Sequence, residues 1–480
     1  MNTTTTPSSA MLAHPSRRMK FLGPKMLFNL VGSAVMAWAP CLSAEESSTL
    51  GFRGDGSGVF PNATLPALDL KNGKGVAWRS ELPAAGNSSP VILGQAVIVT
   101  ADPDLVIAYN QTDGKELWKK SIGVVDGLTP EQDQQLRSLL LKYIATPVNQ
   151  RKPVAGEIGA VVGPAKGRHW GPGEFGWSLP TPVSDGKRVY VVFYTGMVAA
   201  FDAAGAILWT NCLPKLSVDA SPILADGVLV ISGRGGIRGL DPATGKVRYE
   251  APAAPRATPA VWRKNGASYL IHANGLVVAA ADGKVLAPAA DWRQITEASP
   301  VLAGDRVIIT FGNDHGAGDQ QVAAYDLALA DGKITLTEAW RGTPLLPNST
   351  PEKPVKRNFS RISPLVVGEL VITPVPGNAL FVHRLKDGTL LDPVPGVAID
   401  GQAHTFWPNP ILVGQTVVMP QAWGKLTMLK PGGTSFQVQS VEAVLNHEGK
   451  RPSGPRMGAS PLAWGSTLFL RTENEIIALR

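Results

Sequence analysis

Cysteine is scarce in this sequence. Only Cys41 and Cys212 occur among the 480 residues, and Cys41 falls in an N-terminal stretch that we expect to be removed. One remaining thiol excludes an internal disulfide in the mature chain. Packing alone must therefore hold the fold together.

Charge is also sparse, and its balance gives no reason to expect a nucleic-acid partner. Charged residues make up 17% of the chain, and the formal net charge is +7. The first 44 residues contain four basic residues and no acid: Arg17, Arg18, Lys20 and Lys25. The rest of the chain carries 41 basic and 38 acidic residues, so the mature protein is nearly neutral and its overall charge predicts no nucleic-acid binding.

Long apolar runs are missing after the N-terminus. There, a basic stretch precedes the apolar run MLFNLVGSAVMAWAP and a small residue before two acids. This pattern predicts a signal peptide over residues 1–44, cleaved after Ala44, and then an N-terminal extension over residues 45–74. Sec and Tat export both stay open, as does the true start codon. We expect a periplasmic or secreted monomer without a transmembrane segment in the mature chain.

Common catalytic and metal-binding motifs are missing as well. The sequence has no P-loop and no GxSxG motif, and GRGGIRG (233–239) departs from the dinucleotide-binding spacing. The six histidines after the leader show no short metal-ligand spacing. The stretch GNDHGAGDQ (312–320) does not match a calcium-binding EF-hand loop. We therefore predict neither catalytic residues nor a metal site.

What the sequence does contain is a repeat. A polar turn leading into an apolar strand recurs at 113–118 (DGKELW), 202–209 (DAAGAILW) and 241–250 (DPATGKVRYE), with weaker copies later in the chain. A small polar residue followed by proline accompanies it in eight copies: Ser89-Pro90, Thr181-Pro182, Ser221-Pro222, Thr258-Pro259, Ser299-Pro300, Ser363-Pro364, Asn409-Pro410 and Ser460-Pro461. Asp-Gly turns between short β-branched runs indicate hairpins.

Each repeat predicts four short antiparallel strands, and the prolines recur about every 53 residues. Such sheets cover their faces by standing in a ring. The predicted fold is all-β, an eight-bladed β-propeller of four-stranded antiparallel blades over residues 75–480. The last unit lacks a fourth strand, and we expect the N-terminal strand GVAWRSELP (75–83) to close the ring by pairing with the C-terminal strand IIALR in the last blade.

This repeat resembles that of the PQQ-like (pyrroloquinoline quinone) β-propeller family. The resemblance is carried by the TGK turn followed by an aromatic residue, by the Ser-Pro units, and by GFRGDGSGVFP (51–61) followed by WRSELPAAGNSSPVI. It covers roughly residues 51–480 and implies the fold. It does not single out a function, because such repeats occur in quinoprotein dehydrogenases and in BamB-type outer-membrane assembly factors.

The long segments between strands are expected on one rim of the ring. In a four-stranded blade, the connections between blades and the loops between the second and third strands share a rim, which we call the insertion rim. The DGK turns lie on the opposite rim, the turn rim, which is expected to carry short turns only. Four long segments fall on the insertion rim: 119–178, 312–320, 341–361 and 441–458. We interpret this rim as the binding face.

The largest of these segments, at about 119–178, predicts a helical insertion. The stretch TPEQDQQLRSLLLKYIA (129–145) has an N-cap threonine, proline at the first helical position and glutamine in a capping box. Leu136, Leu140 and Tyr143 share one helix face. Two interpretations stay open: a helix packed on the rim, or a helix offered to a partner.

The residues three positions before each repeat proline are expected at the mouth of a central channel. Over four neighbouring blades their charges alternate in sign, which suits either mutually paired ions or a polar ligand site. The candidate ligand- or partner-binding residues are Asn87, His169, Trp170, Asp219, Arg256, Glu297, Arg361, His404 and Trp407.

The favoured hypothesis is an exported, non-catalytic scaffold, similar to the BamB-type proteins, that binds an envelope or secreted protein partner or a small polar ligand. No cofactor is expected. The alternative is a PQQ-dependent dehydrogenase of alcohols or sugars, for which the resemblance implies a quinone with Ca²⁺ between a tryptophan platform and a vicinal disulfide. No adjacent cysteines occur here, and the candidate platforms are Trp262, Trp292, Trp407 and Trp423. A third hypothesis, polysaccharide binding or hydrolysis, would use Glu174 and Glu297.

Overall fold

The structure is a computed structural model of the chain. It describes residues 50–147, 150–162, 171, 176–290, 298–311, 321–342, 362–375, 379–391, 408–421, 424–433, 435–445 and 456–480. All of these residues belong to the second of two compact units, Glu46–Arg480. The predicted signal peptide lies outside the described residues.

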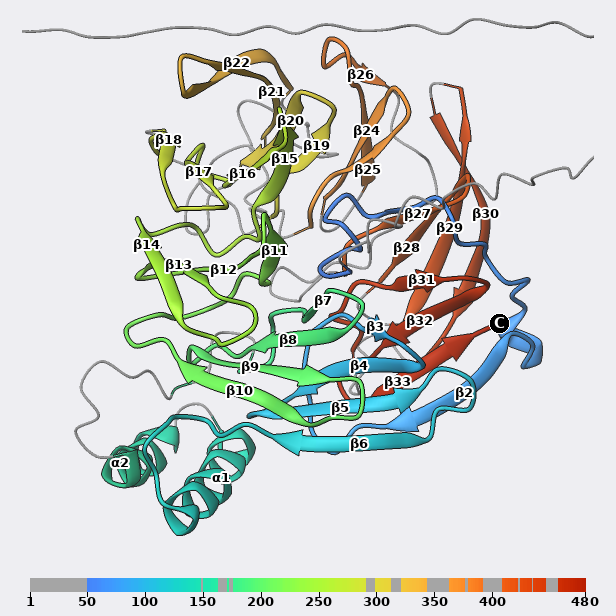
Figure 1. Cartoon of the computed structure of the whole chain (residues 1–480). Helices are drawn as coiled ribbons and strands as arrows, with labels where there is room; N and C mark the ends of the chain where they lie inside the picture. Colours follow the sequence, from blue (N-terminus) through green and yellow to red (C-terminus); the bar gives the residue numbers. More distant parts are fainter. Residues whose placement is uncertain are drawn as a thin grey trace, which may run out of the picture. The chain divides into compact units, whose positions relative to one another are not determined.

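Eight sheets form an eight-bladed β-propeller, which confirms the predicted fold (Figure 1). Seven sheets have four strands, and the sheet of blade 7 has a fifth strand, β1, on the free edge of its first strand. The described chain has few helices beside them, α1 (Pro130–Ala145), α2 (Arg151–Val162) and the short 3-10 helix η1 (Leu70–Asn72).

The first four blades follow one another along the chain. Blade 1 comprises β3 (Val91–Leu93), β4 (Ala96–Ala101), β5 (Leu105–Asn110) and β6 (Glu116–Ser121); blade 2, β7 (Val183–Ser184), β8 (Arg188–Val192), β9 (Met197–Asp202) and β10 (Ile207–Cys212); blade 3, β11 (Ile223–Ala225), β12 (Val228–Gly233), β13 (Gly236–Leu240) and β14 (Val247–Ala251); blade 4, β15 (Ala260–Lys264), β16 (Ala267–Ile271), β17 (Val277–Ala279) and β18 (Val285–Ala287).

The last four blades include both ends of the described chain. Blade 5 comprises β19 (Val301–Ala303), β20 (Arg306–Phe311), β21 (Gln321–Ala330) and β22 (Lys333–Gly342); blade 6, β23 (Leu365–Val367), β24 (Leu370–Val375), β25 (Ala379–Arg384) and β26 (Leu390–Leu391); blade 7, β27 (Ile411–Val413), β28 (Thr416–Pro420), β29 (Lys425–Gly432) and β30 (Ser435–Ala443), with β1 (Val59–Phe60); blade 8, β31 (Leu462–Trp464), β32 (Thr467–Arg471), β33 (Glu475–Leu479) and β2 (Val76–Glu81).

The ring closes as predicted, with an N-terminal strand in the last blade. Strand β2 pairs antiparallel with β33, and Trp78 lies opposite Ala478. The two strands come from opposite ends of the described chain, so the ring cannot open without breaking this pairing. Closure in this way leaves no gap between the first and last blades.

The small polar residue before each repeat proline links neighbouring blades at the centre of the ring. The backbone N–H of Thr181 donates to the Ser221 hydroxyl oxygen at 3.0 Å, and that of Ser221 donates to the Thr258 hydroxyl oxygen at 2.9 Å. Equivalent bonds run from 89 to 181, 299 to 363, 363 to 409 and 409 to 460. The sequence pattern therefore serves two needs: proline begins the strand, and its neighbour satisfies a backbone donor of the preceding blade.

The DGK turns carry the outer contacts between blades. The indole N–H of Trp209 on β10 donates to the Pro242 carbonyl at 3.0 Å, and its ring lies over Gly245. A Cβ atom on Gly245 would be 2.4 Å from that ring. Four further aromatic residues use the next blade's turn in the same way: Trp78, Trp118, Tyr249 and Trp340. In these five cases the turn receives the aromatic side chain of the neighbouring blade, which gives the repeated turn a second use beside closing the hairpin.

Two hairpins extend the turn rim because their strands are longer than those of blade 1, although the connecting turn in blade 5 is short. The hairpin β21–β22 has strands of 10 residues, and β29–β30 has strands of 8 and 9 residues, against 6 residues in β5 and in β6. In blade 5 the additional pairs end in a tight turn at Asp331 and Gly332, whose φ angles are 50° and 69°. Two positive φ angles are the geometry of a two-residue hairpin turn that follows the twist of the strands.

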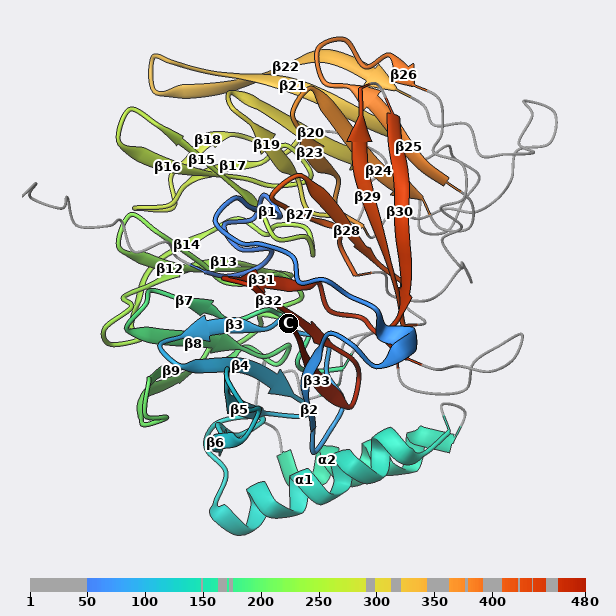
Figure 2. The same ribbon diagram turned by 90° about the vertical axis from the view of Figure 1, so that its right-hand side faces the viewer.

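The N-terminal extension crosses the centre of the ring. Leu50 forms an isolated antiparallel bridge with Ser184 on the first strand of blade 2. Strand β1 then pairs in parallel with β27, the first strand of blade 7 (Figure 2). Farther along, the Thr64 N–H donates to the Gly465 carbonyl in the first hairpin turn of blade 8 at 2.8 Å. One segment thus hydrogen-bonds to the inner edges of blades 2 and 7 and to the first hairpin turn of blade 8.

Candidate functional site

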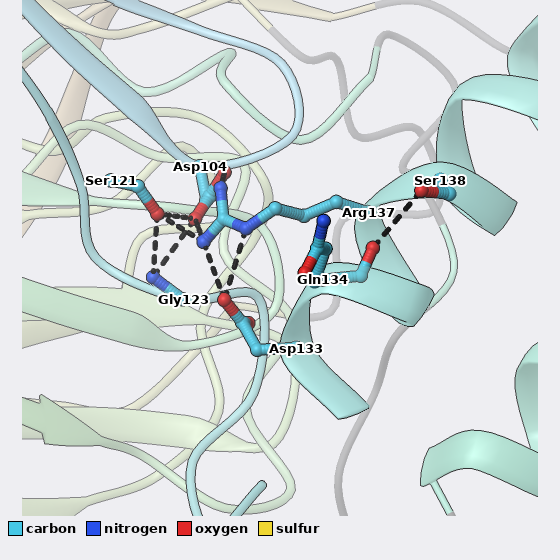
Figure 3. Close-up of polar contacts among 7 residues, drawn as sticks. All are labelled: Asp104, Ser121, Gly123, Asp133, Gln134, Arg137 and Ser138. Carbon is cyan, nitrogen blue, oxygen red and sulfur yellow. Dashed lines mark hydrogen bonds and ion pairs between the residues drawn. The ribbon is translucent and has the colours of Figure 1, made fainter. Parts of the chain in front are cut away.

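The helical insertion is held on the insertion rim by a buried ion pair. Arg137 on α1 reaches Asp104 in the loop between β4 and β5, with Nη1–Oδ1 and Nη2–Oδ2 distances of 2.6 Å each (Figure 3). The Asp104 side chain is fully buried and also accepts a hydrogen bond from the Gly123 N–H. Burial disfavours the Arg137 charge, but the carboxylates of Asp104 and Asp133 outweigh this and raise its pKa.

Apolar contacts complete the attachment of the insertion. Leu136 and Leu140 on α1 are fully buried in one cluster with residues of blades 1 and 2. Helix α2 adds Val154, Ile158 and Val162 to the same cluster. The predicted capping box is present, since Thr129 and Gln132 exchange side-chain-to-backbone bonds at both positions. The predicted packing of the first helix on the rim is therefore confirmed. Helix α2 was not predicted, because a proline and two glycines within it made its sequence look unlike a helix.

We predict that Arg137→Met loosens the helical insertion. The change leaves the buried Asp104 carboxylate without its main counter-charge, at a cost of about 1–3 kcal/mol. Hydrogen exchange and limited proteolysis should accelerate over residues 130–162 while the blades keep their protection. The matched control is Lys142→Met, because the Lys142–Glu157 pair is about half exposed at both ends and such pairs contribute little. Equal acceleration in both variants would contradict the assigned anchor.

Helix α1 presents two apolar side chains to solvent beside its anchored face. Leu141 is 54% exposed and Ile144 is 40% exposed. They are three positions apart, so they neighbour each other on one face of the helix. Ile144 is one turn from the fully buried Leu140, so the exposed pair lies at the border of the anchored face of the helix. The insertion therefore offers a small apolar surface on a rigidly attached helix.

Of the predicted channel-mouth residues, the structure brings Asp219 and Arg256 together. Arg256 Nε lies 2.9 Å from Asp219 Oδ2, and Nη2 lies 3.2 Å from Oδ1, a bidentate pair between neighbouring blades. Arg234 approaches the same carboxylate at 3.6 Å. For these two residues the structure supports the interpretation of mutually paired ions. Six predicted site residues lie outside the described residues: His169, Trp170, Glu297, Arg361, His404 and Trp407.

Asn87 lies at the seam between blades 8 and 1. A Cβ atom on Gly458 would be 2.2 Å from its Oδ1 atom, so the Asn87 amide packs directly against the backbone at Gly458. These are the equivalent positions, three before the repeat proline, of two adjacent blades. The expected part of Asn87 in a channel-mouth binding site stays a prediction.

A buried polar cluster near Asn87 was not predicted. Arg471 at the end of β32 donates from Nη1 to the Ser88 carbonyl at 3.1 Å. Asp102, in the loop after β4, accepts from the N–H groups of Trp177 and Ser178 and from the Ser178 hydroxyl, at 2.6 to 3.0 Å. Burial raises the pKa of Asp102 and lowers that of Arg471 to about 10. No motif marks either residue, because burial of these two loops depends on contacts between three blades.

The described residues give little support to a quinone site. Of the four tryptophans considered as platforms, Trp262 alone lies in the described part of the chain. Its side chain is 2% exposed within β15, and its indole N–H donates to Asp305 Oδ1 at 2.9 Å. Trp262 belongs to the apolar cluster of blades 4 and 5, and Tyr269 and Lys264 also lie against its ring, so the ring is not open to a ligand. We derive no chemical step through a quinone.

The described residues contain neither a cluster of metal-binding side chains nor a membrane-spanning helix. Within the described ranges, no group of three or more His, Cys, Asp or Glu side chains is placed to hold a metal ion. Among the same residues, no helix has the length and apolar character needed to cross a membrane. Glu174, considered for polysaccharide chemistry, lies outside the described residues.

Similar structures share the propeller fold. The chain resembles the crystal structure of BamB from Moraxella catarrhalis with a TM-score of 0.53 and 11% identity, over 84% of this chain and 99% of that one. It resembles a europium-containing methanol dehydrogenase with a TM-score of 0.51 and 10% identity, over 91% of this chain and 98% of that one. At these identities the likeness shows the fold alone. No curated protein matches the sequence.

The sequence itself carries a family assignment. Residues 40–146 and 155–328 match the family described as outer membrane protein assembly factor BamB. The match covers more than half of the chain and includes blades 1 to 4 as well as the extension that crosses the ring. Together with the eight blades, the interblade aromatic contacts and the Ser-Pro ring, this match shows that the chain belongs to the BamB family of PQQ-like repeat β-propellers.

Proposed function

We propose that this protein is a non-catalytic binding scaffold that engages a protein partner of the cell envelope through its insertion rim. The observation that carries the proposal is the helical insertion. Arg137 and the apolar cluster fix α1 to blades 1 and 2, while Leu141 and Ile144 stay exposed. Rigid, solvent-facing apolar side chains on an insertion are typical of a protein contact surface.

The location of the proposed partner follows from the predicted export signal. We propose that residues 1–44 are removed and that the mature chain works in the periplasm or outside the cell. The match to a family described as an outer membrane protein assembly factor supports this location. Mass measurement of the processed protein would test cleavage after Ala44, and an intact N-terminus in the envelope fraction would contradict it.

Site-specific crosslinking tests the proposed contact surface. A photoreactive residue at Leu141 should give a discrete crosslinked protein in the envelope of the producing organism. Ile144→Glu, introduced in the same chain, should abolish that product because it places a charge on the contact. The control position is Val285, which is 38% exposed on β18 of blade 4. No product from Leu141, or the same product from Val285, would contradict the proposed surface.

The dehydrogenase alternative has its own test. The processed protein is incubated with PQQ and Ca²⁺, separated from free quinone, and its absorption spectrum is recorded. The scaffold proposal expects no stoichiometric quinone band. A stoichiometric band together with oxidation of an alcohol or sugar would replace the scaffold by a quinoprotein.

A further inference from the structure

Arg53 lies at the centre of the propeller. Its Nη2 atom donates to the carbonyl oxygens of Pro364 at 3.1 Å and Pro410 at 3.2 Å. These prolines begin the first strands of blades 6 and 7. The side chain is 1% exposed. The guanidinium group is therefore buried on the axis, at the level where the Ser-Pro units link neighbouring blades.

The extension carries Arg53 inward from the turn rim. Residues 50 and 64 hydrogen-bond near the first hairpin turns of blades 2 and 8, at Ser184 and Gly465. Between these points the chain turns back, since the Gly58 N–H donates to the Arg53 carbonyl at 3.1 Å and β1 then runs out along β27. Arg53 thus occupies the inner end of a hairpin-like loop that enters the ring from the turn rim.

The loop is shaped around the guanidinium group. Gly58 has a φ angle of +79°, and a Cβ atom there would be 2.5 Å from Arg53 Nη2 and 2.8 Å from Nε. Only glycine permits both this backbone angle and this close approach. Gly54, also at positive φ, packs against Phe60. The sequence GFRGDGSG therefore builds a fixed seat for one arginine side chain.

Two nitrogen atoms of this seated arginine lack acceptors. Nε and Nη1 of Arg53 are buried and have no hydrogen-bond partner among the described residues. The acidic residue that interacts electrostatically with Arg53 is Asp55, which is exposed and whose carboxylate accepts a hydrogen bond from the Ser57 N–H. Burial lowers the pKa of Arg53 to about 9, so the side chain still carries its charge near neutral pH. An unpaired buried charge is costly, and such groups are normally satisfied by an ion or by ordered water.

Arg471 provides a contrast within the same protein. It is also 1% exposed, and its Nε and Nη2 atoms lack hydrogen-bond partners. However, the buried Asp102 carboxylate acts on it as a counter-charge. Arg53 has no buried acid in that role among the described residues that affect it. The positive charge on the axis is thus left for something other than a described side chain to balance.

We propose that Arg53 is the anchor of an axial anion-binding site, in which one of its unpartnered N–H groups, Nε or Nη1, donates to the phosphate, sulfate or carboxylate group of a small ligand. Charge-assisted hydrogen bonds to oxyanions are the interactions that a guanidinium group makes best. The loop that carries Arg53 enters the ring from the turn rim, so we expect the ligand to approach the guanidinium group from the other side. The site is independent of the proposed partner surface on α1, and either can fail without the other.

Anion-dependent thermal stability tests the site. The processed protein is melted in sodium phosphate, sulfate or acetate against sodium chloride at matched ionic strength. Ligands that bind only the folded state raise the melting temperature in a saturable way. We expect such a rise for at least one of the three anions and at least a tenfold loss of apparent affinity in Arg53→Gln. The matched control Arg471→Gln should keep the rise, because Asp102 already balances that arginine.

The same site can be seen directly in the unmutated protein, which covers the case in which Arg53→Gln fails to fold. Crystals grown without phosphate or sulfate are soaked in selenate, and anomalous density is measured. We expect a selenium peak within hydrogen-bond distance of Arg53 Nε or Nη1. A water molecule alone at that place, no saturable rise in melting temperature, or a rise unchanged in a folded Arg53→Gln variant would overturn the proposal.

Discussion

Trp78→Ala is expected to lower the free energy of unfolding by about 3–5 kcal/mol, the range for truncating a large buried aromatic side chain. Trp78 is 8% exposed on β2, and its indole N–H donates to the Gln111 carbonyl of blade 1 at 3.0 Å. Its ring covers Gly114 and lies 6.0 Å from the Phe469 ring. The residue thus joins the N-terminal strand, blade 8 and blade 1, so its loss weakens the closure of the ring as well as the core.

Chemical denaturation of the two variants Trp78→Ala and Trp464→Ala measures this effect with a matched control. Trp464 belongs to the same blade, on β31, but is 42% exposed, and substitutions at such positions usually change stability by less than about 0.5 kcal/mol. A loss of similar size in both variants would show that Trp78 has no special part in closing the ring.

The architecture was predictable because the same pattern of turns and strand starts recurs eight times in the sequence. Each Ser-Pro unit and each DGK turn has a local meaning, a strand start or a hairpin, and a closed ring of sheets is the arrangement that buries them all. The spare strand around Trp78 could be assigned because the last unit lacked a fourth strand. The contacts between blades were not predictable in the same way, since nothing local says that the Ser221 hydroxyl accepts a bond from another repeat.

The site was less accessible to prediction than the fold. Spacing from the repeat prolines identified Asp219 and Arg256 as neighbours across a blade seam, and the structure pairs them. Arg53, by contrast, lies outside the repeat, and the spacing of the repeat says nothing about its position. The glycines around it do form a turn, but the turn is folded into the ring. Burial of a charged side chain outside a repeat depends on long-range contacts that a local pattern does not contain.

Lowering the pH from 7.5 to 5.0 is expected to destabilise the protein by about 4 kcal/mol through two buried histidines. His272 and His383 are both fully buried, and within the part of the chain that the structure describes neither ring nitrogen of either residue has a hydrogen-bond partner. Burial lowers the pKa of His272 to about 3 and that of His383 to about 4. The unfolded chain, with ordinary histidine pKa values near 6.5, then binds more protons than the folded chain throughout this range.

The direction in which pH changes the folding stability follows from that difference in bound protons. The stability contributed by the neutral histidines is complete above about pH 6.5 and is lost as the pH falls toward 4, at about 2 kcal/mol per histidine by pH 5.

Urea unfolding of the wild type and of His272→Leu at both pH values measures the histidine contribution. The variant should lose about half of the pH dependence, whatever its stability at pH 7.5, because leucine fills the apolar site without titrating. An unchanged pH dependence in His272→Leu would mean that His272 is protonated in the folded chain or that its surroundings relax to admit water. His383 stacks on Trp340 at a centroid distance of 6.0 Å, so the corresponding substitution there also disturbs the contact between blades 5 and 6 and is the less direct test.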